Sequence, residues 1–379
     1  MKLAKERNIP TIHFVARDGY MVKTAFDMLN RDAVKSSYIR LSRKALILAD
    51  VKTPEDLYSL FRKVNVPHIT PKKLTEYLHP IIPMETEQIR QILAENHIFY
   101  DRDFSSIAEY KKCVKVLIEN ILDFSLLPAY HEELRVYFSD IIKPGDYIFD
   151  IGYSGRPEAA LSSILGFPVG SLYIHVNSDM AGKRQLQYHC PNECFYENKP
   201  CITGVMREHM LMELGPSTIG YEMVGGRLVP KFEPYGEEYF SAFMTRQLQS
   251  AALDFIRDYC SVFGEYRESM VLPLEALSAP FEYYLHDAKS FDRRLFATLP
   301  FEDALGEGDT FGALDFWERE LSTHNLTGDQ HGAAYLPLDL SDLYMDGLFV
   351  KFYRMINKRF PKGSRARALV KRIARMFVR

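Results

Sequence analysis

Short apolar runs of strand length recur along the first 180 residues, and a polar turn follows each of the first three. Helical spacing of apolar residues resumes after the first and third turns, and a helix is also expected from Lys44 after the second. Strands that alternate with helices in this way form parallel sheets. The sequence therefore predicts an α/β fold with a Rossmann-like, mostly parallel sheet. The predicted strands are 11–16, 38–41, 147–151 and 169–176.

Helical patterns dominate two other parts of the chain. Residues 52–142 contain several amphipathic segments with capping chemistry such as Thr53 before Pro54, which predicts a helical insert that caps the strand ends. Segment 217–234 has the pattern of a β-hairpin that turns at Gly225 and Gly226. We divide the chain into a ligand-binding core at 1–51 and 143–235, an insert at 52–142, a helix-rich region at 236–350 and a basic amphipathic tail or linker at 351–379.

Composition and charge indicate a globular body and a separate basic tail. Hydrophobic residues make up 47% of the chain, enough for a buried core. The net charge is only −3, but residues 351–379 hold eleven Lys or Arg and no acid, so the first 350 residues carry −14. This acidic body, without a recognisable nucleic-acid motif, argues against a nucleic-acid partner.

Cysteine usage and hydropathy indicate the compartment. Five cysteines are an odd number and do not suggest a secreted disulfide framework. No window reaches the roughly 18 consecutive apolar residues of a membrane span, and the first residues lack the apolar core of a signal peptide. We expect a cytoplasmic protein.

The three polar turns form the candidate site, because the carboxyl ends of parallel strands meet at one edge of a sheet, where open α/β folds bind ligands. Glycines let backbone N–H groups approach an anion, helix N-termini favour negative charge, and arginine binds phosphate oxygens in a fork. The alternative is that these residues only cap helices.

Each group of residues has an expected role. Phosphate or substrate binding is assigned to Arg17, Gly19, Ser42, Arg43, Gly152, Ser154 and Gly155. Asp18 and Asp150 are the candidate catalytic residues and would contact sugar hydroxyls or a divalent cation, which favours Mg²⁺ as cofactor. Ser154 is a weaker candidate nucleophile, because "GYSG" is one residue short of a Gly-x-Ser-x-Gly elbow.

Segments 9–29, 38–46 and 147–177 resemble the region downstream of the phosphatase domain in predicted hydrolases of the haloacid-dehalogenase (HAD) superfamily. Those proteins occur in cell-surface polysaccharide clusters, include rhamnan-synthesis proteins and are often fused to glycosyltransferases. The resemblance implies a role in polysaccharide biosynthesis and a glycosyltransferase partner. The HAD nucleophile lies in an Asp-x-Asp-x-Thr/Ser motif after an N-terminal strand, and no predicted strand here leads into that motif, so the resemblance does not extend to the phosphatase mechanism.

The stretch "FDIGYSG" also resembles the phosphate loop of type I phosphoribosyltransferases. Asp150 takes the second acid position and Ser154 with Gly155 the turn that cradles the 5-phosphate, while turn 17–19 lies where an early pyrophosphate-binding turn is expected. Phe149 replaces the first acid and Pro157 the later hydroxyl residue. The resemblance thus implies phosphate binding more than a complete transferase reaction.

Four potential zinc ligands lie close together at His189, Cys190, Cys194 and Cys201. Thiolate and imidazole suit a tetrahedral zinc site. Their spacing departs from paired Cys-x-x-Cys knuckles, however, and free cysteine is often a small buried hydrophobe. Both interpretations stay open at this point.

Residues 364–379 form a basic amphipathic pattern. Such a helix suits an anionic membrane surface, and equally a linker to another domain. The leading hypothesis is an enzyme-like module that binds a phosphorylated sugar or nucleotide sugar in cell-surface polysaccharide biosynthesis. The alternatives are a non-catalytic scaffold that positions a glycosyltransferase at the inner face of the membrane, and a phosphoribosyltransferase-like enzyme.

Overall fold

The computed structural model describes most of the first 264 residues and two short strands beyond them. The described residues are 2–30, 34–61, 70–152, 155–176, 187–197, 210–234, 242–264, 266, 300–301 and 311–312. The chain divides into two compact units, of which the first comprises Met1–Asn198, Met210–Val262 and Glu302–Thr310. In the second, β8 (Pro300–Phe301) pairs antiparallel with β9 (Phe311–Gly312).

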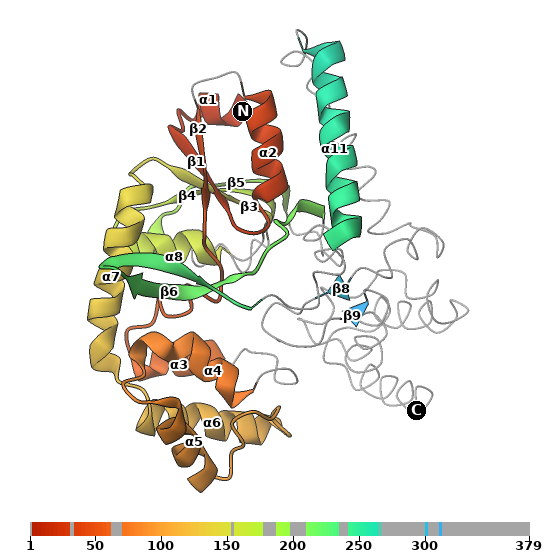
Figure 1. Cartoon of the computed structure of the whole chain (residues 1–379). Coiled ribbons are helices and arrows are strands. Elements are labelled where there is room, and N and C mark those ends of the chain that lie inside the picture. The colour runs from red at the N-terminus through yellow and green to blue at the C-terminus, as the bar shows by residue number, and fades with distance from the viewer. Residues whose placement is uncertain are drawn as a thin grey trace, which may run out of the picture. The chain divides into compact units, whose positions relative to one another are not determined.

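A five-stranded parallel sheet forms the centre of the first unit (Figure 1). Its order is β2-β1-β3-β4-β5, and every neighbouring pair is parallel. The predicted α/β, Rossmann-like sheet is confirmed. Strand β2 lies on one side of β1, and β3 lies on the other. The side on which strands are added to the sheet therefore switches at the β1–β3 pair, which we call the crossover point. The strands are β1 (Thr11–Val15), β2 (Lys35–Ile39), β3 (Tyr147–Asp150), β4 (Gly170–Val176) and β5 (Asn192–Glu197).

Helices connect these strands. Helix α1 (Lys2–Glu6) precedes β1, and α2 (Tyr20–Leu29) joins β1 to β2. Helix α8 (Arg156–Leu165) joins β3 to β4. Between β2 and β3 lie α3 (Pro54–Phe61), α4 (Pro71–Leu78), η2 (His79–Ile81), α5 (Thr86–Glu95), α6 (Ile107–Asn120), η3 (Phe124–Leu126) and α7 (Leu127–Ile141). The expected hairpin is present as β6 (Thr218–Val224) and β7 (Arg227–Phe232), with positive φ at Gly225 and Gly226, and α11 (Ala242–Phe263) follows it.

The two faces of the sheet bury different cores, because successive strand side chains point to opposite faces. On one face Val15, Ile39 and Ile148 join a large cluster that includes the apolar side chains of the helices between β2 and β3. On the other face Phe14 and Phe149 pack against α1 and α2. The helices of segment 52–142 therefore share the core of one sheet face.

Two local predictions differ from the structure. The helix expected from Lys44 is wrong: residues 43–50 form successive turns, with Ile47 N–H bonded to the Lys44 carbonyl at 3.2 Å. Almost every side chain from 44 to 49 is buried, so this segment has no solvent-facing side like that of an amphipathic helix. Strand β5 was not expected, because its hydrophobic pattern is weak: the polar residues Asn192, Glu193 and Glu197 make up half of it.

Candidate functional site

Two carboxylates lie at the carboxyl ends of adjacent strands. Asp150 is the last residue of β3, and Asp18 lies in the turn after β1, whose Phe14 pairs with Phe149. Asp150 is only 9% exposed. Burial, followed by the nearby charge of Asp18, raises the pKa of Asp150 to about 7, while Arg43 acts in the opposite direction. The structure thus brings Asp18, Asp150 and exposed Arg43 together at the strand crossover point, where doubly wound folds bind ligands.

The turn after β3 needs glycine at two positions. Gly152 has φ 133° and Gly155 has φ 69°, backbone conformations that other residues rarely adopt. The Gly152 N–H is hydrogen-bonded to Asp150, and Gly155 directly precedes α8. A helix start next to glycines suits an anion. Ser154, predicted to bind phosphate, lies outside the described residues.

Gly19 allows a close approach of the first turn to its own strand. A Cβ there would lie 2.7 Å from the Val15 carbonyl oxygen and 2.9 Å from the Val15 nitrogen. The Gly19 N–H also donates to the Val15 carbonyl at 2.7 Å. Gly19 therefore has a steric reason to be glycine, independent of any contact with phosphate.

Replacing Gly19 by Ala is expected to lower the free energy of unfolding by about 1–3 kcal/mol, because backbone atoms cannot yield to the added methyl group. Gly220→Ala is the matched control, since a Cβ at Gly220 meets nothing within 4 Å. Urea unfolding monitored by circular dichroism measures both variants. Equal stability of the two would contradict the steric assignment.

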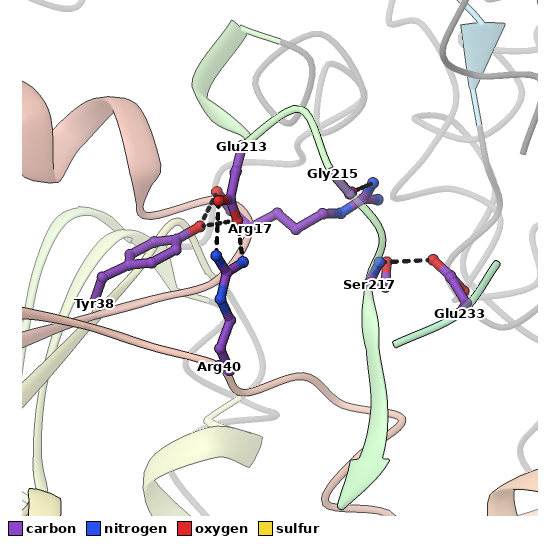
Figure 2. Close-up of polar contacts among 7 residues, drawn as sticks. All are labelled: Arg17, Tyr38, Arg40, Glu213, Gly215, Ser217 and Glu233. Carbon is purple, nitrogen blue, oxygen red and sulfur yellow. Dashed lines mark hydrogen bonds and ion pairs between the residues drawn. The ribbon is translucent and has the colours of Figure 1, made fainter. Parts of the chain in front are cut away.

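A segment that is distant from Arg17 in the sequence holds this residue in place. We call residues 213–217 the strap; Figure 2 shows it beside the ends of β1 and β2. Arg17 Nη1 donates to the Gly215 carbonyl at 3.1 Å, and Glu213 N–H donates to the Arg17 carbonyl at 2.8 Å. Arg40 donates to the Glu213 carboxylate through both terminal guanidinium nitrogens. The Arg17 guanidinium thus contacts the strap.

Sequence reasoning missed Glu213 and Arg40. Arg40 directly follows β2 and lies two residues after Tyr38, so the two side chains share one side of the strand end. This aromatic–basic pair is the sequence signal that could have identified Arg40. Glu213 carries no comparable signal, because it precedes the hairpin in a stretch without clear periodicity. Only its tertiary contacts identify it.

The second turn is held by the hairpin. The Ser42 hydroxyl donates to the Thr218 carbonyl and accepts from the Ala45 N–H at 3.0 Å. The Lys44 ammonium pairs with the Glu233 carboxylate at 3.0 Å, and the Lys44 side chain is only 8% exposed. In this structure Ser42 therefore links the turn to β6 rather than pointing a free hydroxyl toward a ligand.

A buried acid lies beneath the third turn. Glu158, in the first turn of α8, is fully buried and accepts from the hydroxyls of Ser171, at 3.2 Å, and Tyr173. Its charge also contributes to the raised pKa of Asp150. Sequence reasoning missed it, because an acid in a first helical turn is ordinary helix-dipole chemistry. Glu158 ties the start of α8 to β4 and thereby supports the turn.

The predicted zinc ligands have separate surroundings where the structure describes them. The Cys190 thiol is buried 3.2 Å from the Ser162 hydroxyl, and burial raises its pKa. Cys194 on β5 packs against Tyr173 and Val176. Among the described residues no group of three or more His, Cys, Asp or Glu side chains is arranged to hold a metal ion. Cys201 lies outside them.

The letters of the HAD motif occur at residues 101–105, "DRDFS", but not at a strand end. This segment lies in the loop between α5 and α6. Asp101 pairs with Arg90 at 2.5 Å, and the Ser105 hydroxyl donates to Glu109. The segment therefore lacks the strand-end position of that nucleophile.

The described site combines two acids, an arginine and a glycine turn at a helix start. Neutral Asp150 can donate a hydrogen bond. Its ionised form can accept a proton, accept a hydrogen bond from a sugar hydroxyl or coordinate a divalent cation.

The predicted basic tail, 364–379, lies outside the described residues. None of the helices in the described ranges has both the length and the hydrophobicity of a transmembrane span. Comparison with protein-family models and with curated proteins finds no match for the chain.

Proposed function

We propose that the carboxyl edge of this sheet binds a phosphorylated sugar or nucleotide sugar. The observation that carries the proposal is the pairing of Asp18 with buried Asp150 at the crossover between β1 and β3. A buried carboxylate near a second one costs free energy in the absence of a cation or hydrogen-bond donor. Binding sites commonly retain such unfavourable pairs because the ligand relieves them.

The residues around this pair suggest how the ligand is oriented. Arg43, which lies near Asp150, and the Gly155 N–H directly before α8 would take the phosphate. Asp18 and Asp150 would take the sugar hydroxyls. They also fit Mg²⁺, which is commonly held by one or two carboxylates together with phosphate oxygens.

The biological setting comes from the sequence resemblance alone. A role beside HAD-type hydrolases and glycosyltransferases in cell-surface polysaccharide biosynthesis is the setting that this resemblance implies. The proposal concerns binding, and any reaction at the site would use Asp150 as the proton-transferring group, because a pKa of about 7 suits that task.

Isothermal titration calorimetry tests the proposal with ribose 5-phosphate, glucose 1-phosphate, UDP-glucose and phosphoribosyl pyrophosphate, each with and without Mg²⁺. At least one compound is expected to bind, and Mg²⁺ is expected to tighten its binding. Because the cation requires ionised Asp150, Mg²⁺ affinity should fall about tenfold from pH 8 to pH 6. Asp18→Asn should weaken binding at least about tenfold, as one charge-assisted contact is lost.

The matched control is Asp140→Asn, which neutralises an exposed carboxylate at the end of α7. Its affinities should equal those of the wild type. Absence of binding for all four compounds in both conditions would refute the proposed function.

A further inference from the structure

We propose that Glu213 is a positioning residue, which through the strap holds the Arg17–Asp18 turn in the geometry that the ligand needs. This inference rests on the proposed function, because it concerns the same site. It assigns a role to a residue that lies 196 positions after Arg17 and contacts the turn directly.

The strap fixes the first turn through main-chain and side-chain contacts. The Arg17 carbonyl accepts from Glu213 N–H at 2.8 Å and from the Tyr38 hydroxyl at 3.3 Å. The Arg17 guanidinium donates to the Gly215 carbonyl at 3.1 Å (Figure 2). Asp18 is the next residue, so these bonds restrain the backbone that carries its carboxylate.

Glu213 is itself held in a single geometry. Its carboxylate accepts from both terminal nitrogens of Arg40, with Nη2 at 2.8 Å, and shares the single Tyr38 hydroxyl proton, at 3.1 Å, with the Arg17 carbonyl. The Arg40 guanidinium lies 5.0 Å from the ring centre of Tyr38 and 5.5 Å from that of Phe232. A two-bond fork clamped between rings restrains direction as well as distance.

Both ends of the strap are also attached. The Gln249 amide of α11 donates to the carbonyl of Met212 at 2.8 Å, directly before the strap. Ser217 N–H donates to the Glu233 carboxylate at 3.0 Å at the other end. The strap is thus bonded to Arg17 after β1 and to Tyr38 and Arg40 at the end of β2, while Asp18 lies near Asp150 at the end of β3.

Glu213→Gln tests this role, because it keeps the shape of the side chain and removes the charge that the Arg40 fork requires. The probe is ribose 5-phosphate, glucose 1-phosphate, UDP-glucose or phosphoribosyl pyrophosphate with Mg²⁺, whichever binds the wild type most tightly. Its binding should weaken about tenfold, since small displacements of positioned groups have effects of that order or larger. Hydrogen exchange should accelerate in peptides that cover 210–217 and 16–20. Peptides from β4 should be unchanged.

Asp101→Asn is the matched control, because it breaks a similar fork far from the site. Arg90 binds Asp101 through two nitrogens, at 2.5 and 3.2 Å, and lies 4.4 Å from the Tyr100 ring centre. The control should bind the same probe within about twofold of the wild type, as surface pairs contribute little.

The outcomes separate this inference from the proposed function. Faster local exchange with an unchanged dissociation constant would overturn the positioning role and leave the proposed function intact. Faster exchange that includes β4 would show general destabilisation and would also overturn it. A wild-type protein that binds none of the tested compounds would refute the proposed function and the positioning role together.

Discussion

Replacing Asp150 by Asn is expected to stabilise the protein at pH 8 by about 2–4 kcal/mol, while Mg²⁺-dependent ligand binding is lost. The pKa of Asp150 is raised from 3.8 to about 7, so between about pH 4 and pH 7 the native state binds more protons than the unfolded state. Stability therefore falls as pH rises through this range, and the loss is complete above pH 7. Asparagine carries no charge and can still accept the Gly152 N–H through its amide oxygen.

Urea unfolding of Asp150→Asn and of the wild type at several pH values between 4 and 8 measures this effect. The two stability curves should converge near pH 4 and separate above it. Asp146→Asn is the control with the opposite expected sign, because the Asp146 carboxylate is buried among hydrogen-bond donors. A destabilised Asp150→Asn at pH 8 would contradict a net free-energy cost of ionising the buried Asp150.

Replacing Asp146 by Ala is expected to destabilise the protein by about 2–4 kcal/mol, because the buried His13 ring and the part-buried Lys143 main-chain N–H lose their partner. Asp146 Oδ2 lies 3.0 Å from His13 Nε2 and 2.8 Å from the main-chain nitrogen of Lys143. His13 is 2% exposed and Asp146 3%. The other ring nitrogen of His13, Nδ1, lies 2.6 Å from the Ser37 hydroxyl.

The same unfolding measurement tests this second prediction, with Ser37→Ala as a graded control. Ser37 is half-buried, so loss of its hydroxyl removes one bond to His13 and should cost about 1 kcal/mol. A cost below about 1 kcal/mol for Asp146→Ala would mean that water or other groups satisfy His13. These three residues lie along β1 and β2 and just before β3, and we assign them a structural role.

Periodicity was sufficient to predict the strands that carry the site. The apolar runs at 11–16 and 147–151 correspond to β1 and β3, because a buried strand in a parallel sheet needs apolar residues on both faces. The helix from Lys44 failed for a tertiary reason. Its side chains are buried almost without interruption, and the Lys44 ammonium is paired with Glu233 of the hairpin.

Part of the candidate site was also visible in the sequence. Asp18 follows one predicted strand and Asp150 lies near the end of another, and parallel strands align their carboxyl ends. Glu158 was hidden because helix starts commonly carry acids. Arg40 and Glu213 were hidden because they are 173 residues apart, and no local pattern records a pairing at that separation.

The sequence by itself determined the strand–turn–helix units and the polar residues in their turns, since backbone preferences and hydrophobic periodicity act over a few neighbouring residues. Tertiary structure alone decided that β1 lies between β2 and β3. That order sets Asp18 beside Asp150, and burial raises the pKa of Asp150 to about 7. It also decided that the strap lies against the end of β1. Strand order and burial depend on how the whole chain packs, and so they are absent from any single segment.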